Sequence, residues 1–173
     1  TIFFLGLFFS QVSFGFSLIN TMDKVVFWED SMMPLKFDYN LSDCSGVDKG
    51  KIISEIEKGL DLWNRVPGTK LQLQLGDEST DTHETLLGDS FQIRNPLIEC
   101  RTDFVNKFGG GNANSRRIAV GGYVSAGYAG QRMSIRKGYI MLNSDATSDV
   151  GDYMSKYPSK IFFTIAHEAG HVI

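Results

Sequence analysis

Three side chains near the end of the sequence have the types and spacing of a zinc hydrolase site, namely His167, Glu168 and His171. On a helix His167 and His171 are an i, i+4 pair, so both imidazoles project from one face and can bind a single Zn²⁺. Glu168 points about 100° around the helix from His167, where its carboxylate would act as a general base on a water. The H-E-x-x-H pattern is a metalloprotease signature. The sequence therefore predicts two metal ligands and one catalytic carboxylate, with a buried helix and two core histidines as the alternative.

A catalytic zinc usually has three protein ligands and an open position for water, so one more ligand is needed. The only other histidine, His83, lies in the polar stretch 76–84, which is typical of an exposed loop. We expect His83 to be a solvated loop residue, although an acidic loop with a histidine could hold a structural Ca²⁺ ion. The third zinc ligand is therefore expected to follow Ile173.

The start of the sequence has the pattern of a secretory signal. Residues 2–9 are an apolar run too short to span a membrane, and small and polar residues follow it. We expect residues 1–18 to be part of a signal peptide, without its initiator methionine, with a membrane anchor or a buried strand as alternatives. The mature protein would then be secreted or extracellular, or periplasmic in a Gram-negative organism, with no stable membrane association.

Composition excludes several classes of function. A net charge of −3 with 21% charged residues offers no basic surface, so we expect no nucleic acid partner. The chain lacks a G-x-x-x-x-G-K-[ST] phosphate loop, and residues 23–160 are too polar for a set of membrane spans. ATP-dependent and intramembrane proteases are thereby excluded.

Cys44 and Cys100 fit a disulfide or two buried thiols equally well, and nothing indicates an oligomeric state.

Hydrophobic periodicity predicts the elements that must position the motif. Asp48 can cap a helix with an apolar stripe at positions 52, 53, 56, 60 and 63, which Pro67-Gly68 terminates. Leucine alternates with glutamine at residues 71–75, as in a strand with one buried face. Ser159 can cap the helix that carries the motif, residues 161–173. Further strands are expected at residues 24–29, 35–40, 91–94, 117–125 and 138–143, and a short helix at 149–156.

This order of elements resembles the N-terminal half of the metzincin zinc endopeptidases, in the matrixin-like or astacin-like manner. The resemblance is carried by the strands at 36–39, 71–75 and 139–143, by the helix end at 60–66 and by the motif helix at 163–173. It implies an α+β fold with a twisted, mostly parallel mixed sheet, an antiparallel edge strand, one long backing helix and an active-site helix. Residues 19–173 would be the N-terminal part of one catalytic domain, whose C-terminal part is missing.

The resemblance also implies a function. The protein would be a secreted zinc-dependent endopeptidase that hydrolyses peptide bonds with a zinc-activated water and Glu168 as general base. A peptide or protein substrate would lie extended along an edge strand, for which Ile118–Tyr123 is the best candidate, although its two glycines could equally well mark a β-bulge. The family motif continues with a glycine and, three residues further, a third histidine. The alternatives are a non-catalytic protease-like binding domain and a zinc peptidase of another HExxH clan.

Overall fold

The computed structural model describes residues 20–21, 24–88, 92–107, 116–129 and 132–173. The segment predicted to be a signal peptide, residues 1–18, lies outside these residues. Within the described part of the chain, no helix combines the length and the hydrophobicity needed to cross a membrane.

One mixed sheet organises the described chain. Its seven strands are β1 (Asn20–Thr21), β2 (Lys24–Phe27), β3 (Leu35–Asn40), β4 (Leu73–Glu78), β5 (Leu97–Arg101), β6 (Ala119–Ala129) and β7 (Arg132–Asn143). The adjacent strands β4, β3, β5 and β7 are all parallel. β6 pairs antiparallel with β7 and has no second neighbour among the described residues. β2 pairs parallel with the first part of β7 and antiparallel with β1. This mostly parallel sheet with an antiparallel outer strand agrees with the predicted fold class.

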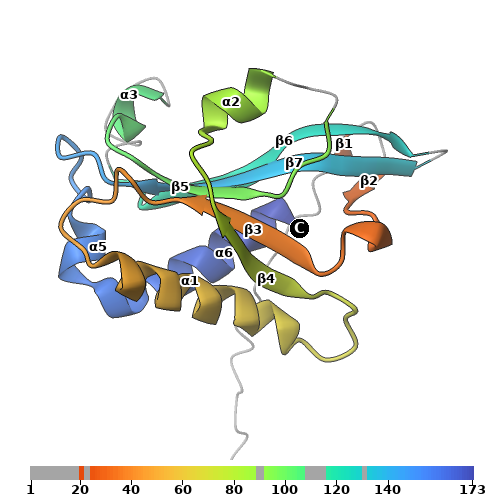
Figure 1. Ribbon diagram of the computed structural model, residues 1–173, viewed down its shortest axis with the longest axis horizontal. Coiled ribbons are helices and arrows are strands. Elements are labelled where there is room, and N and C mark those ends of the chain that lie inside the picture. Colours follow the sequence, from red (N-terminus) through yellow and green to blue (C-terminus); the bar gives the residue numbers. More distant parts are fainter. Residues whose placement is uncertain (1–19, 22–23, 89–91, 108–115, 130–131) are drawn as a thin grey trace, which may run out of the picture.

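Helices lie on both faces of this sheet, as Figure 1 shows. The helices are α1 (Lys49–Asn64), α2 (His83–Gly88), α3 (Phe104–Lys107), α5 (Tyr153–Lys156) and α6 (Ile161–Val172), with 3-10 turns η1 (Asp30–Met32) and η2 (Pro158–Lys160). α1 and α6 cover one face, while α2 and α3 lie on the other. The hydrophobic core lies between the sheet and the pair α1 and α6, and it includes Phe37, Ile56, Ile140 and Ile165.

The backing helix α1 forms as the sequence predicts. The side chain of Asp48 accepts a hydrogen bond of 2.9 Å from the backbone N–H of Lys51, which satisfies one free donor of the first turn. Ile52, Ile56 and Leu60 are fully buried on one stripe. The helix ends at Asn64, before the proline.

Several predicted elements are displaced. The prediction of a strand at 91–94 is wrong, since residues 92–94 lie outside any strand. The strand in this region is β5, at Leu97–Arg101. Residues 97–100 are all buried, so no alternating pattern marks β5. β4 begins at Leu73 and extends to Glu78, because its last residues pair with β3. β6 and β7 are longer than expected and form one hairpin.

Two further predictions are resolved by the structure. The Ser159 cap is wrong: Pro158–Lys160 form a 3-10 turn that leads into α6, and no side chain caps this helix. Cys44 and Cys100 form a disulfide, with their Cα atoms 5.1 Å apart. The bridge joins the loop after β3 to β5, so the two-thiol alternative is excluded.

Candidate active site

The motif helix α6 has two distinct stripes. Ile161, Ile165, Ala169 and Val172 are buried against the core, at the spacing of one helix face. Phe163, His167 and His171, four residues apart, are exposed. The predicted metal ligands therefore lie on the solvent side of a firmly packed helix.

Glycine on each side allows α6 to approach its neighbours closely. A Cβ atom at Gly59 of α1 would lie 2.8 Å from the Cβ of Ile165. At Gly121 of β6 it would lie 2.5 Å from the carbonyl oxygen of Glu168 and 2.9 Å from its Cβ. Real side chains do not tolerate such distances, so α6 can occupy this position only because both residues lack a side chain.

Both tryptophans of the chain hold the backbone of α6. Trp63, at the end of α1, donates its indole N–H to the carbonyl oxygen of Ala166 at 2.8 Å. Trp28 donates its indole N–H to the carbonyl oxygen of Val172, also at 2.8 Å. The second carbonyl belongs to the last turn of the helix, where no intrahelical donor is available. The two bonds fix the helix immediately before the first histidine and immediately after the second.

His167 and His171 are close enough to act on one metal ion. Their ring centroids lie 5.0 Å apart, with an angle of 81° between the ring planes. Two exposed imidazoles at this separation suit zinc, for which imidazole nitrogen is a common ligand. The described residues contain no group of three or more His, Cys, Asp or Glu side chains arranged to hold a metal. The donor set therefore fits zinc as a pair of ligands and not as a complete site.

Glu168 lies one residue further around the helix and is buried, with 8% of its surface exposed. Burial raises the pKa of its carboxyl group, while His167, His171 and a hydrogen bond with the backbone of Gly121 act in the opposite direction. The side chain is thus held between α6 and the outer strand β6, beside the two histidines. This environment suits a carboxyl group that exchanges a proton.

The structure corrects the prediction for His83. It is the first residue of α2 and is half-buried, whereas the sequence predicted a solvated loop residue. Its ring packs edge-on against Tyr139 with 4.5 Å between centroids, and its Nδ1 atom is buried with no hydrogen-bond partner in the described structure. Burial, followed by the charge of Lys107, lowers the pKa of this imidazole. Since α2 and α6 lie on opposite faces of the sheet (Figure 1), His83 lies across the sheet from the histidine pair.

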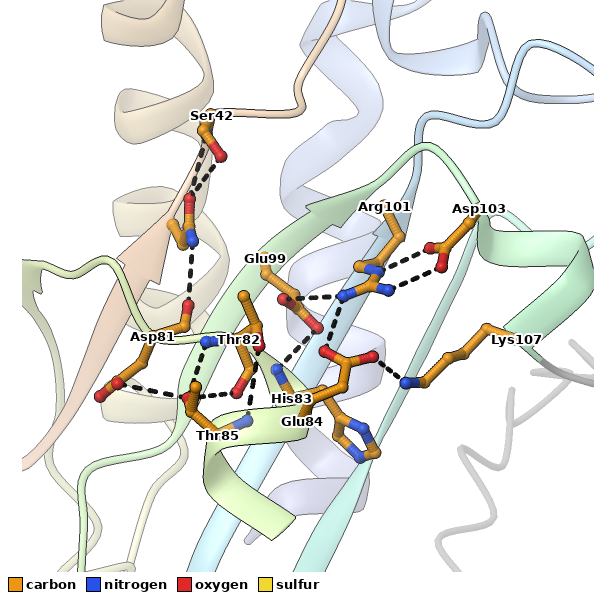
Figure 2. Close-up of polar contacts among 11 residues, drawn as sticks. Ser42, Asp81, Thr82, His83, Glu84, Thr85, Glu99, Arg101, Asp103 and Lys107 are labelled. Carbon is orange, nitrogen blue, oxygen red and sulfur yellow. Dashed lines mark hydrogen bonds and ion pairs between the residues drawn. The ribbon is translucent and has the colours of Figure 1, made fainter. Parts of the chain in front are cut away.

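A polar network attaches α2 to the sheet, as Figure 2 shows. The buried carboxylate of Glu99 accepts a hydrogen bond of 3.2 Å from the backbone N–H of His83. Arg101 donates to Glu84 at 2.9 Å and to Asp103 at 2.8 Å, and Lys107 also bonds Glu84. These contacts join three elements, so no local pattern in the sequence could indicate them. Glu84 belongs to the acidic stretch 76–84 that could hold a calcium ion. Its carboxylate is bound by the side chains of Arg101 and Lys107.

Comparisons with models of known protein families, with curated proteins and with solved structures find no match to this chain.

Proposed function

We propose that this protein is a secreted, zinc-dependent endopeptidase of the metzincin kind. The observation that carries the proposal is the arrangement on α6, where two exposed histidines flank a buried glutamate. A pair of core histidines, the alternative for this motif, would not be exposed. The disulfide between Cys44 and Cys100 supports an oxidising compartment and therefore export.

His167 and His171 would hold the zinc ion, and a third ligand would come from outside the described residues, as expected beyond Ile173. When bound, zinc supplies Lewis acidity to the substrate carbonyl and to water. Both imidazoles belong to a helix that Trp28 and Trp63 hold at its backbone, so their spacing is maintained without the metal. Such pre-organisation reduces the cost of assembling the site.

Glu168 would move the proton during hydrolysis. Its carboxylate would take a proton from the attacking water and pass it to the nitrogen of the leaving amine. Burial raises the pKa of this carboxyl group, which makes the carboxylate a stronger base toward the attacking water in the first step. The backbone of Gly121 forms a hydrogen bond with this carboxylate.

The substrate would bind in an extended conformation along β6. This strand pairs only with β7 among the described residues, so its outer edge can accept a peptide strand through backbone hydrogen bonds. Gly121 and Gly122 lie in this strand directly beside Glu168 and Tyr139. A peptide on this edge would therefore pass next to the proton-transferring carboxylate.

Zinc content tests the metal assignment most simply. The full-length protein should contain one zinc per chain and cleave an unfolded protein substrate, and a chelator should abolish cleavage until zinc is restored. His167→Ala and His171→Ala should each lose zinc and cleavage. His83→Ala is the matched control and should keep both, because His83 lies across the sheet. Loss of zinc in the His83 variant alone would overturn the assignment.

The non-catalytic binding domain is the second candidate, because the described residues complete only two of three zinc ligands. Its signature would be stoichiometric zinc with no cleavage of any peptide tested. Cleavage that depends on zinc and on His167 excludes this candidate.

A further inference from the structure

A cavity of about 340 Å³ lies beside the candidate catalytic residues. One wall is formed by His167 and Glu168 of α6, and Phe163 lies one turn earlier on the same helix. The opposite wall is the segment that leads into β6, including Arg116, Arg117 and Ile118. A group placed in this cavity would therefore be adjacent to the centre where hydrolysis is proposed.

The cavity is rich in cations, although the chain as a whole has a net charge of −3. Arg116 has only one described ion pair, to Asp149 at 3.5 Å, and both side chains are largely exposed. Arg117 is exposed and has no carboxylate within ion-pair distance in the described chain, yet its charge acts on the carboxyl group of Glu168. The lining of the cavity thus brings two guanidinium groups close to the carboxyl group of Glu168.

The arginine segment is held in place by a buried side chain. Asn143 is fully buried at the end of β7. Its side-chain amide donates to the carbonyl oxygen of Arg117 at 2.7 Å, and its backbone N–H donates to the carbonyl oxygen of Ile118 at 2.8 Å. The same amide nitrogen also donates a hydrogen bond of 2.8 Å to the hydroxyl oxygen of Ser148. The backbone at Arg117 and Ile118 is therefore fixed relative to the end of β7.

We propose that this cavity binds an acidic side chain of the substrate, glutamate or aspartate, next to the peptide bond that is cleaved. The inference rests on the proposed function, since it assigns a preference to that same site. Guanidinium groups bind carboxylates through paired, charge-assisted hydrogen bonds. Phe163, which is 57% exposed, and Ile118 supply apolar surface for the methylene groups of the side chain. Arg116 and Arg117 would be the residues that determine specificity.

Peptides that differ only by glutamate or glutamine beside the scissile bond test this preference. The full-length protein should cleave the glutamate peptide with kcat/KM about tenfold higher or more, as expected for a hydrogen bond to a charged group. The double variant Arg116→Gln, Arg117→Gln should reduce this ratio to about one. Arg65→Gln removes an equally exposed arginine at the end of α1 and should leave the ratio unchanged. Equal cleavage of the two peptides by the unmodified protein would overturn the proposal.

A binding measurement separates this proposal from the proposed function. Fluorescence anisotropy of the labelled glutamate and glutamine peptides with the Glu168→Gln variant reports binding without turnover. Tighter binding of the glutamate peptide, lost in the double arginine variant, supports the cavity even if no peptide is ever cleaved. Cleavage without any difference between the peptides retains the proposed function and rejects the cavity. Circular dichroism of the arginine variants confirms that each is folded.

Discussion

Gly121 and Glu168 are in direct backbone contact, so closely that a single methyl group at position 121 would lie 2.5 Å from the carbonyl oxygen of Glu168. The outer strand β6 and the motif helix α6 therefore meet at the residue proposed to transfer the proton. The same glycine hydrogen-bonds the carboxylate through its backbone. The strand on which the substrate is proposed to bind and the catalytic side chain are thus positioned by one contact.

Gly121→Ala should therefore damage both stability and catalysis. Overpacking of this kind costs about 1–3 kcal/mol, and the displaced helix would carry Glu168 away from the outer strand. Gly122→Ala is the control, because a Cβ there would lie 3.6 Å from the Tyr139 hydroxyl, an ordinary contact. Urea unfolding and peptide cleavage should show losses for the first variant only. Equal effects at the two positions would contradict the proposed contact.

The two indole hydrogen bonds should contribute unequally to stability. Trp28→Phe leaves a buried carbonyl of the last helical turn without its donor, which costs about 1–3 kcal/mol. Trp63→Phe should cost less, because Trp63 is only half-buried and solvent can replace its bond to Ala166. Unfolding followed by circular dichroism measures the loss of stability in both variants. Fluorescence is less suitable, because each variant lacks one of the two tryptophans. A larger loss for Trp63→Phe would count against this account.

Glu99 should make the stability of the protein depend on pH. Burial raises the pKa of its carboxyl group from 4.5 to about 7. The charges of Arg101 and Lys107 and the hydrogen bond from the His83 backbone N–H lower this pKa, whereas the charge of Glu84 raises it further. Because the folded state holds this proton more strongly, the stability that the group contributes is present below pH 4.5 and is lost as pH rises through 7.

Glu99→Gln keeps the side chain neutral at every pH. Its free energy of unfolding should exceed that of the unmodified protein by a margin that grows between pH 5 and 8, to at most about 3 kcal/mol. Glu57→Gln, on the exposed face of α1, is the charge-matched control. Parallel stability curves for the Glu99 variant and the unmodified protein would show that the burial of Glu99 has no such consequence.

The disulfide should be an important source of stability. Cys44 and Cys100 are 56 residues apart, and closing a loop of this length stabilises the folded state by about 4 kcal/mol in the chain-entropy model. Replacing both cysteines by serine should lower the denaturant midpoint accordingly. A reducing agent should lower the midpoint of the unmodified protein and leave that of the double variant unchanged. Identical midpoints for the two proteins would exclude a structural disulfide.

The elements that the sequence predicts well are those that bury one face. β3 and α1 have a clear stripe with period 2 or 3.6, and both form within a residue or two of the expected bounds. The sequence pattern does not locate β5, because residues 97–100 are all buried and a charged residue, Glu99, lies within this buried run. The partial burial of His83 cannot be predicted from its local sequence, because its ring packs against Tyr139, which lies far away in the sequence.

The histidines and glutamate of the candidate site can be found in the sequence because five consecutive residues contain them all. The residues that support them cannot be found in the sequence in this way. Trp28 contacts a carbonyl 144 residues away and Trp63 one 103 residues away, so neither contact leaves a local pattern. The role of Gly121 likewise depends on the packing of β6 against α6, which the folded chain alone displays.

The central claim is that Glu168 transfers the proton and does not bind the metal. The most direct test measures zinc content and peptide turnover in the same sample of full-length Glu168→Gln. We predict one zinc per chain, as in the unmodified protein, with turnover lower by about 10²–10⁴-fold, the usual contribution of a general acid or base. Turnover close to that of the unmodified protein, with zinc in place, would contradict the account.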